Sequence, residues 1–169
     1  HADKVIMANP AQLVNTIHSL FHTYEDKFVL TPNYHVFEMY MPHAGATAVR
    51  TAFVSPRVGF TRFDAQRKEI PANFWGLNGS ASVNGKTVTL TAVNPDAKNI
   101  RETEINISGS KIVSGNARVL SSTDIRARNS FQNPNGLVPR DESVIIGANG
   151  RLVYKFAPAS VTRLSLRLA

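Results

Sequence analysis

The chain has 169 residues, of which 43% are hydrophobic and 18% are charged, which is enough apolar material for the core of one ordinary domain. It contains no cysteine, so disulfide bonds and thiolate metal sites are excluded. The formal net charge is +7, but Lys and Arg fall singly or in pairs without interleaved aromatics, so we expect no nucleic-acid groove.

The sequence contains no visible signal for a membrane or for a particular cellular compartment. The apolar runs are too short to cross a bilayer, so we expect no membrane-spanning segment. No positively charged segment followed by an apolar one marks a signal peptide. A signal in upstream sequence would not be seen here, and the localisation therefore stays undetermined between cytoplasmic and secreted.

The N-terminal residues predict a strand that leads directly into a helix. Residues 4–7 are largely apolar, Asn9 is a typical N-cap residue, and Pro10 suits the first helical position. Apolar residues then recur at spacings of three and four, at Leu13, Val14, Ile17, Leu20, Phe21 and Tyr24. We therefore expect half of a βαβ unit, with a helix that extends to Tyr24.

Gln12 admits two interpretations in this arrangement. Asn9 and Gln12 have the spacing of a capping box, in which the Gln amide bonds the backbone N–H of the N-cap residue. Gln12 would also lie at the carboxyl end of the strand, where α/β folds bind their ligands. The two roles are compatible, and the local sequence does not decide between them.

A second helix is predicted from the pair Thr31-Pro32, a capping hydroxyl followed by proline. Polar residues 25–27 form a turn before it, and residues 28–30 are a short apolar segment. The helix should end near Met41, because Pro42 and Gly45 follow.

From residue 48 onward the periodicity changes to two, which predicts strands. Asn84-Gly85 separates two alternating runs within residues 80–94, a strong signal for a hairpin. Val88, Leu90 and Ala92 should face inward, with Thr87, Thr89 and Thr91 outward. Further strands are predicted at residues 104–107, 117–120, 143–146, 151–156 and 161–168, and a second Asn-Gly pair, Asn149-Gly150, separates two of them. Many short strands with regular turn signals predict a β-sandwich.

Three other features of the sequence can be interpreted either as structural or as functional. His18 and His22 are four residues apart on the predicted helix, but Ser19 stands where a zinc-protease motif has glutamate, so we expect no metal and no cofactor. Trp75 could stack on a sugar, although a single Trp entering a sandwich strand is more often core. The long loop at residues 124–139 could be functional, and we favour a structural role in which it braces the sandwich.

Several motifs resemble one enzyme family. The run HADKVIMANPAQLVN, the string TPNYHVFEMY, VNPD after the first hairpin, NSFQNP at residues 129–134 and APASV near the end are similar to the α-L-arabinofuranosidases of glycoside hydrolase family fifty-one. The resemblance implies a mostly β chain, in which the last strand and helices of a (β/α)8 barrel (1–47) precede a C-terminal antiparallel β-sandwich (48–169). It also implies that Gln12 bonds arabinose, with Asn9 a weaker candidate.

The resemblance further implies what this chain lacks. In the family both catalytic glutamates lie upstream of the segment that HADKV matches, and none of Glu25, Glu38, Glu69, Glu102, Glu104 and Glu142 lies in a catalytic motif. We therefore expect no catalytic residue in this chain and an inactive isolated protein. Its partners would be the upstream barrel segment as a separate chain, arabinose-containing oligosaccharides, and other copies of the assembled enzyme. The alternative is a non-catalytic carbohydrate-binding or scaffolding β-sandwich.

Overall fold

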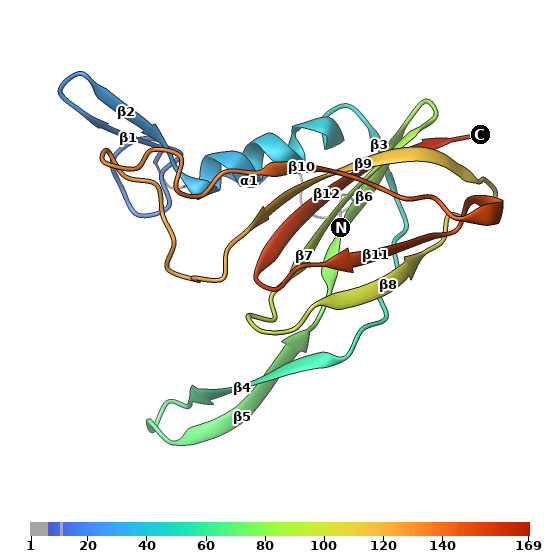
Figure 1. Ribbon diagram of the computed structural model, residues 1–169. Helices are drawn as coiled ribbons and strands as arrows, with labels where there is room; N and C mark the ends of the chain where they lie inside the picture. The colour runs from blue at the N-terminus through green and yellow to red at the C-terminus, as the bar shows by residue number, and fades with distance from the viewer. Residues whose placement is uncertain (1–6, 11) are drawn as a thin grey trace.

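The computed structural model describes residues 7–10 and 12–169, and its elements are almost entirely strands (Figure 1). The helical elements are α1 (Pro32–Tyr40) and the short 3₁₀ turns η1 (Met41–His43) and η2 (Ala148–Gly150). The strands are β1 (Phe21–Tyr24), β2 (Lys27–Leu30), β3 (Thr47–Val49), β4 (Arg57–Phe63), β5 (Glu69–Trp75), β6 (Asn78–Asn84), β7 (Thr87–Asn94), β8 (Arg101–Ile105), β9 (Ile112–Ser121), β10 (Arg140–Ser143), β11 (Leu152–Phe156) and β12 (Ser160–Leu168).

Two antiparallel layers form the body of the protein, which confirms the predicted sandwich. The larger sheet has the order β10-β9-β12-β7-β6-β3, and the smaller one pairs β11 with β8. Strand β12 is central because it pairs with β7 on one side and β9 on the other. The C-terminal strand therefore joins segments that lie far apart in the sequence.

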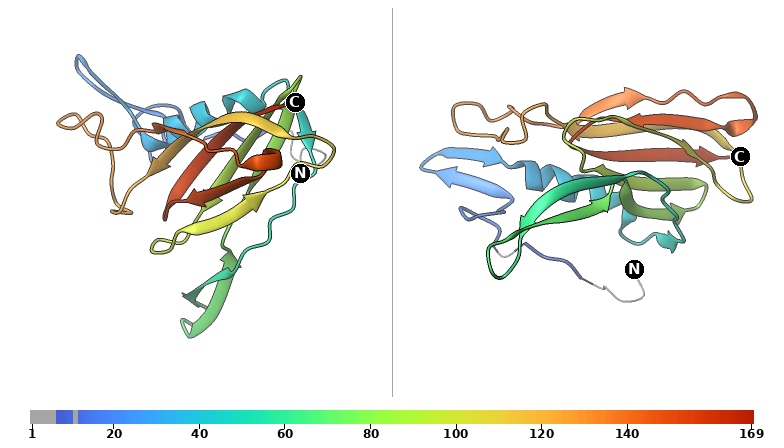
Figure 2. Two further views of the ribbon diagram at one scale, coloured as in Figure 1. Left: turned by 45° about the vertical axis from the view of Figure 1, so that its right-hand side comes forward. Right: turned by 90° about the horizontal axis from the view of Figure 1, so that it is seen from below.

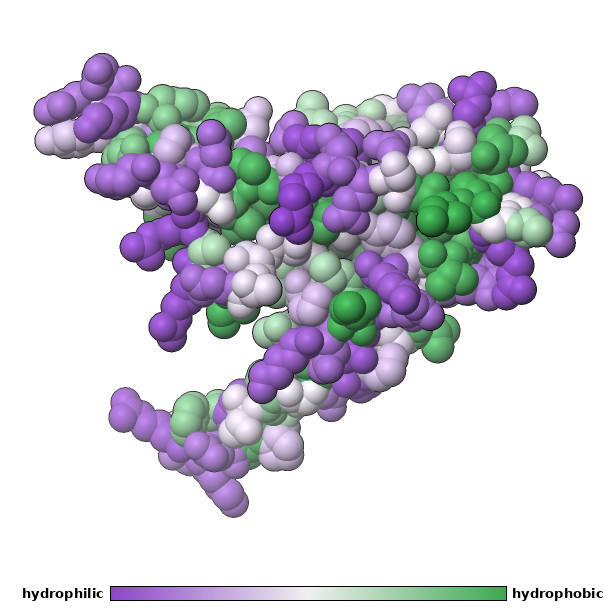
Figure 3. All heavy atoms as spheres, viewed as in Figure 1, coloured by the Kyte–Doolittle hydropathy of each residue, from purple (hydrophilic) through white to green (hydrophobic). Residues whose placement is uncertain are grey.

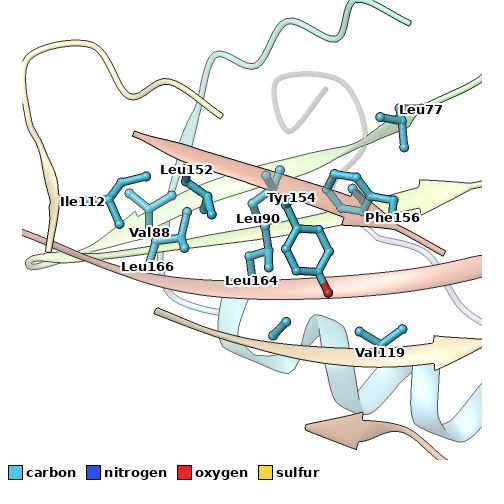
Figure 4. Packing of buried hydrophobic residues seen from close by; sticks show 12 residues of the cluster. Leu77, Val88, Leu90, Ile112, Val119, Leu152, Tyr154, Phe156, Leu164 and Leu166 are labelled. Atoms are coloured by element: carbon cyan, nitrogen blue, oxygen red, sulfur yellow. The ribbon is translucent and has the colours of Figure 1, made fainter. Parts of the chain in front are cut away.

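The core lies between these two layers (Figure 4). Leu152, Tyr154 and Phe156 of β11 point from the smaller sheet toward the larger one, and the alternating burial of β11 follows from the period of two. The larger sheet contributes Val88, Leu90, Ala92, Ile112, Ala117, Val119, Leu164 and Leu166, and Leu77 completes the cluster. The prediction that Val88, Leu90 and Ala92 face inward is confirmed.

The opposite face of the larger sheet is covered by α1, which contacts β9 and β12. This helix begins at Thr31, whose hydroxyl accepts the backbone N–H of Tyr34, and ends at Tyr40 as predicted. His43, just beyond it, hydrogen-bonds Thr91 through Nε2 at 2.9 Å. The predicted outward threonines lie on this second face: Thr87 is exposed, whereas Thr89 and Thr91 are buried because the sheet is covered on both faces.

The predicted helix from residue 10 to Tyr24 is wrong. Residues 12–20 form a turn-rich segment, and Asn15 and His18 have positive φ angles of 55° and 65°, which an α-helix does not allow. The carbonyl of Leu13 accepts the N–H groups of residues 20 and 21 instead of a helical partner. Asn, Ser and Thr side chains in this segment bond nearby backbone groups, and such bonds compete with a helix. The predicted strand at residues 4–7 lies, except for Met7, outside the described residues.

Several strand boundaries also differ from the prediction. The β6–β7 hairpin is present, but its two-residue loop is Gly85-Lys86, with Gly85 at a φ of 56°, which fits the first position of a type II′ turn. The strand expected at residues 143–146 ends at Ser143, and β10 pairs with β9. The runs on either side of Asn149-Gly150 do not pair with each other, because β11 pairs with β8 and residues 148–150 form η2.

The region at residues 51–75, for which we predict no register, contains a hairpin that projects from the sandwich. Strands β4 and β5 pair only with each other. Figures 1 and 2 show this hairpin standing away from the two sheets, and Figure 3 shows apolar and polar atoms exposed on it. Within residues 7–10 and 12–169, no helix combines the length and the apolar character that crossing a bilayer requires.

Candidate functional site

The predicted ligand contact Gln12 lies in a wide, open depression beside the β1–β2 hairpin. The depression has a volume of about 1050 Å³, and its lining comprises Gln12, Asn15, Thr16, Ile17, His18, His22 and Phe131. Gln12 is exposed and makes no hydrogen bond to the described residues. Its amide is therefore available to a ligand. The capping-box interpretation of Asn9 and Gln12 is wrong, because the helix it requires does not form.

Asn15 stabilises the wall of the depression through hydrogen bonds to β1. Its side-chain Oδ1 accepts the backbone N–H of Thr23 at 2.8 Å, and its Nδ2 donates to the Thr23 carbonyl at 3.1 Å. The amide thus pairs with β1 as a neighbouring strand would, and the positive φ at Asn15 is one that asparagine tolerates well. These bonds hold the turn that carries Gln12 and His18 against β1, which carries His22.

Two buried hydroxyl groups stabilise the same segment, and one of them connects it to α1. Ser19 donates to the carbonyl of Phe21 at 3.0 Å, and Thr31 donates to the carbonyl of Ser19 at 2.7 Å. Thr31 also caps α1, so one residue connects the turn to the helix. Phe21 then packs against Tyr34 of α1, with ring centroids 5.6 Å apart. The depression is therefore held on the helix that covers the larger sheet.

The far wall of the depression comes from the loop at residues 124–139. Asn129 is buried, and its Nδ2 donates to the carbonyls of Leu30 and Leu137 at 2.9 and 3.0 Å. Its Oδ1 accepts the N–H of Leu137 at 2.7 Å, which closes the loop on itself. Phe131, two residues later, lies 6.4 Å from Tyr24 between ring centroids. The bracing role that we favour for this loop agrees with these bonds.

The lining has the chemistry of a site for a neutral, hydroxyl-rich ligand. The amide of Gln12, the imidazoles of His18 and His22 and the hydroxyl of Thr16 can all exchange hydrogen bonds with hydroxyl groups. Ile17 and Phe131 supply apolar contact. The described residues that line the depression include no carboxyl group, so they offer no acid and base pair there.

The structure does not bring all the predicted residues together. Asn9 is exposed and does not line the depression. His18 and His22 both line it, but His18 lies in a turn and His22 in β1, so they do not share a helical face. Among the described residues, no group of three or more His, Cys, Asp or Glu side chains is placed to hold a metal. Asn15 and Phe131 were missed by sequence analysis, because their contribution depends on contacts between distant segments.

Known proteins resemble this chain along almost its whole length. Residues 1–160 match the model of the α-L-arabinofuranosidase C-terminal domain. An intracellular exo-α-L-arabinofuranosidase from Bacteroides ovatus is 27% identical over 168 residues, which are 99% of this chain and 31% of that protein. Among crystal structures, the α-L-arabinofuranosidase from Thermotoga maritima, solved as an arabinose complex, has a TM-score of 0.84 at 27% identity.

The arabinofuranosidase from Xanthomonas axonopodis pv. citri, of glycoside hydrolase family 51, has a TM-score of 0.82 at 26% identity. Both of these structures match 99% of this chain, but the match covers only 35% of the Thermotoga chain and 32% of the Xanthomonas chain. The chain thus spans about a third of the length of the relatives that it matches. From its motifs, its sandwich and its match over residues 1–160, the chain belongs to the family of α-L-arabinofuranosidase C-terminal domains.

Proposed function

We propose that this chain is the C-terminal portion of a retaining α-L-arabinofuranosidase that releases terminal arabinofuranosyl groups from arabinan or arabinoxylan oligosaccharides. Retention requires two carboxyl groups, one as nucleophile and one as acid and base. In the proposal the upstream barrel segment supplies both glutamates, and the isolated chain is inactive. The observation that carries the proposal is the family membership together with a Gln12 that is exposed, has no hydrogen bond to the described residues and lies in a depression lined by sugar-compatible groups.

Gln12 acts in this proposal by binding and orienting the arabinose ring. Its amide can donate to one ring hydroxyl and accept from another, which fixes the sugar without making or breaking a bond. Asn9 is kept as a second, weaker contact. Residues 1–47 would complete the barrel and residues 48–169 would form the sandwich, with α1 as the element through which the barrel piece rests on β9 and β12.

The exposed apolar side chains of the N-terminal segment support a covering partner. Ile17 is 82% exposed, Met7 71% and Leu13 56%. All three lie within residues 7–17, and exposed apolar surface that is concentrated in one segment marks interaction sites. The partner in the proposal is the upstream barrel segment, held through an interface of about 2,000 Å² or more, the size of obligate contacts. Further copies of the assembled enzyme are a second partner class.

The test is the Gln12→Ala variant of the assembled enzyme. We expect kcat/KM for an aryl α-L-arabinofuranoside to fall roughly tenfold to a hundredfold, because one buried hydrogen bond to the substrate is lost. The unfolding free energy should stay unchanged, since Gln12 makes no bond to the described residues. Gln132→Ala is the matched control, because Gln132 is also exposed and adjoins Phe131 without lining the depression. Undiminished hydrolysis by Gln12→Ala would remove Gln12 from the substrate site.

A further inference from the structure

A second hollow lies where the projecting hairpin joins the sandwich. Its volume is about 740 Å³, and its walls come from the base of β4 and β5, from β6, and from Tyr40 at the end of α1. Pockets of this size commonly hold small-molecule ligands. The hollow is therefore large enough for a ligand, and five separate elements contribute to it, since Val93 of β7 also lines it.

Trp75 forms the aromatic wall of this hollow. Sequence analysis favours a core position for Trp75, but the structure leaves 50% of its side chain exposed. The guanidinium carbon of Arg57 lies 4.1 Å from the centroid of the indole ring, so it covers one face. Half of the side chain remains exposed despite this contact, which leaves flat aromatic surface on which a ligand can stack.

Arg57 is itself held in place by a second contact. Its Nη1 donates to the Oδ1 of Asn73 at 2.6 Å. Asn73 lies two residues before Trp75 in β5 and therefore on the same face of the hairpin. The side chains of Trp75, Arg57 and Asn73 thus form a preorganised row. The Nδ2 of Asn73 has no hydrogen-bond partner among the described residues.

The other polar groups of the hollow are neutral. Asn78 and Ser80 of β6 are exposed on one face of their strand, and Tyr40 of α1 also lines the hollow. Of the lining residues that the structure describes, none is acidic, and the one cation among them, Arg57, is already engaged by Trp75 and Asn73. An aromatic plane bordered by amides and hydroxyls matches a sugar ring, which has an apolar C–H face and a rim of hydroxyl groups.

We propose that this hollow binds neutral pentose units of a polysaccharide, with Trp75 as the stacking surface and Asn73, Asn78 and Ser80 as hydrogen-bonding partners. The choice of a pentose polysaccharide rests on the proposed function, whereas the site itself rests on the geometry of the hairpin base. The hollow would hold the polysaccharide to the sandwich and so keep the protein on its substrate.

The experiment measures binding of the full 169-residue chain to soluble arabinoxylan, by affinity electrophoresis and by isothermal titration with arabinoxylo-oligosaccharides. We expect the unmodified chain to be retarded, and Trp75→Ala to raise Kd about tenfold or more, as truncation of an anchoring Trp commonly does. Trp75→Phe should keep most of the affinity, because the aromatic plane remains. Phe63→Ala is the matched control, since Phe63 is an exposed aromatic at the far end of the same hairpin, and its Kd should equal that of the unmodified chain.

Ser80→Ile provides a test that leaves Trp75 in place. Isoleucine suits a strand and fills the hollow, so binding should weaken without loss of the hairpin. Absence of binding by the unmodified chain, affinity unaffected by Trp75→Ala and Ser80→Ile, or tighter binding to mixed-linkage β-glucan than to arabinoxylan would each overturn the proposal. No hydrolysis is needed for these measurements, so they fail or succeed independently of the Gln12→Ala assay.

Discussion

Asn94, in the segment VNPD at the end of β7, offers the sharpest test of how the sandwich is held together. Its side chain is fully buried. The Nδ2 lies within hydrogen-bonding distance of three carbonyls, those of Asn99 at 2.9 Å, Phe156 at 3.2 Å and Ala157 at 2.9 Å. The Oδ1 accepts the N–H of Asp96 at 3.1 Å. One amide therefore joins the larger sheet to the end of β11 in the smaller one.

The expected cost of Asn94→Ala follows from these contacts. The amide can satisfy two acceptors at once through its two N–H groups and one donor through its oxygen. Each such bond contributes about 1 kcal/mol net, so their loss together should lower the unfolding free energy by about 3 kcal/mol. The cost is not relieved by water, because the site is buried and the freed carbonyls stay unsatisfied.

Urea denaturation followed by circular dichroism measures this loss. Asn116→Ala is the matched control, because Asn116 lies in the middle of β9 and its side chain is exposed, so its effect should stay within about 0.5 kcal/mol. A loss of less than about 1 kcal/mol for Asn94→Ala would show that the three carbonyls find other partners, and the account of Asn94 as the link between the sheets would be refuted.

Three further predictions concern other contacts. Gly79→Ala should destabilise the protein by about 2 kcal/mol or more in the same urea assay, because a Cβ would lie 2.1 Å from the Thr91 carbonyl oxygen. Gly59→Ala is the control, because its Cβ meets nothing within 4 Å. Equal losses of stability in the two variants would contradict the reasoning. Burial and, secondarily, the charge of Arg163 lower the pKa of His43. The unfolded state therefore binds the proton more readily, and the stability of the protein should fall as pH drops below about 6.5. The melting temperature of His43→Gln should not show this fall with pH, and an unchanged fall would exclude His43 as its source. Asn129→Ala should speed amide hydrogen exchange in residues 124–139, and exchange rates equal to those of the unmodified chain would show that Asn129 does not brace the loop.

The sandwich was predictable because its signals are local and periodic. Alternation of apolar and polar residues marks β11 and β12, and the glycine of Asn84-Gly85 marks the turn between β6 and β7. Thr31-Pro32 marks the start of α1. Each of these signals is produced by neighbours in the chain, so no knowledge of distant contacts is needed to interpret it.

The failures share a different physical cause. Apolar spacing between residues 13 and 24 is typical of a helix, but Asn15 bonds Thr23, and Thr31 bonds Ser19. Residues 12–20 therefore form turns instead of a helix, because side chains bond backbone groups eight and twelve residues away in the sequence. Thr91 is buried on the outer face of the larger sheet because His43 from another element covers it. Helix periodicity alone cannot register such competition.

The sequence by itself determined that the chain is mostly β, where α1 begins, which residues of β7 enter the core, and that Gln12 lies within a family motif. Tertiary structure alone decided that Gln12 is exposed and lines one depression together with Phe131, and that Trp75 is half exposed beside Arg57. The reason is that backbone periodicity and turn chemistry act over a few residues, whereas a site is made by side chains from segments that only packing brings together.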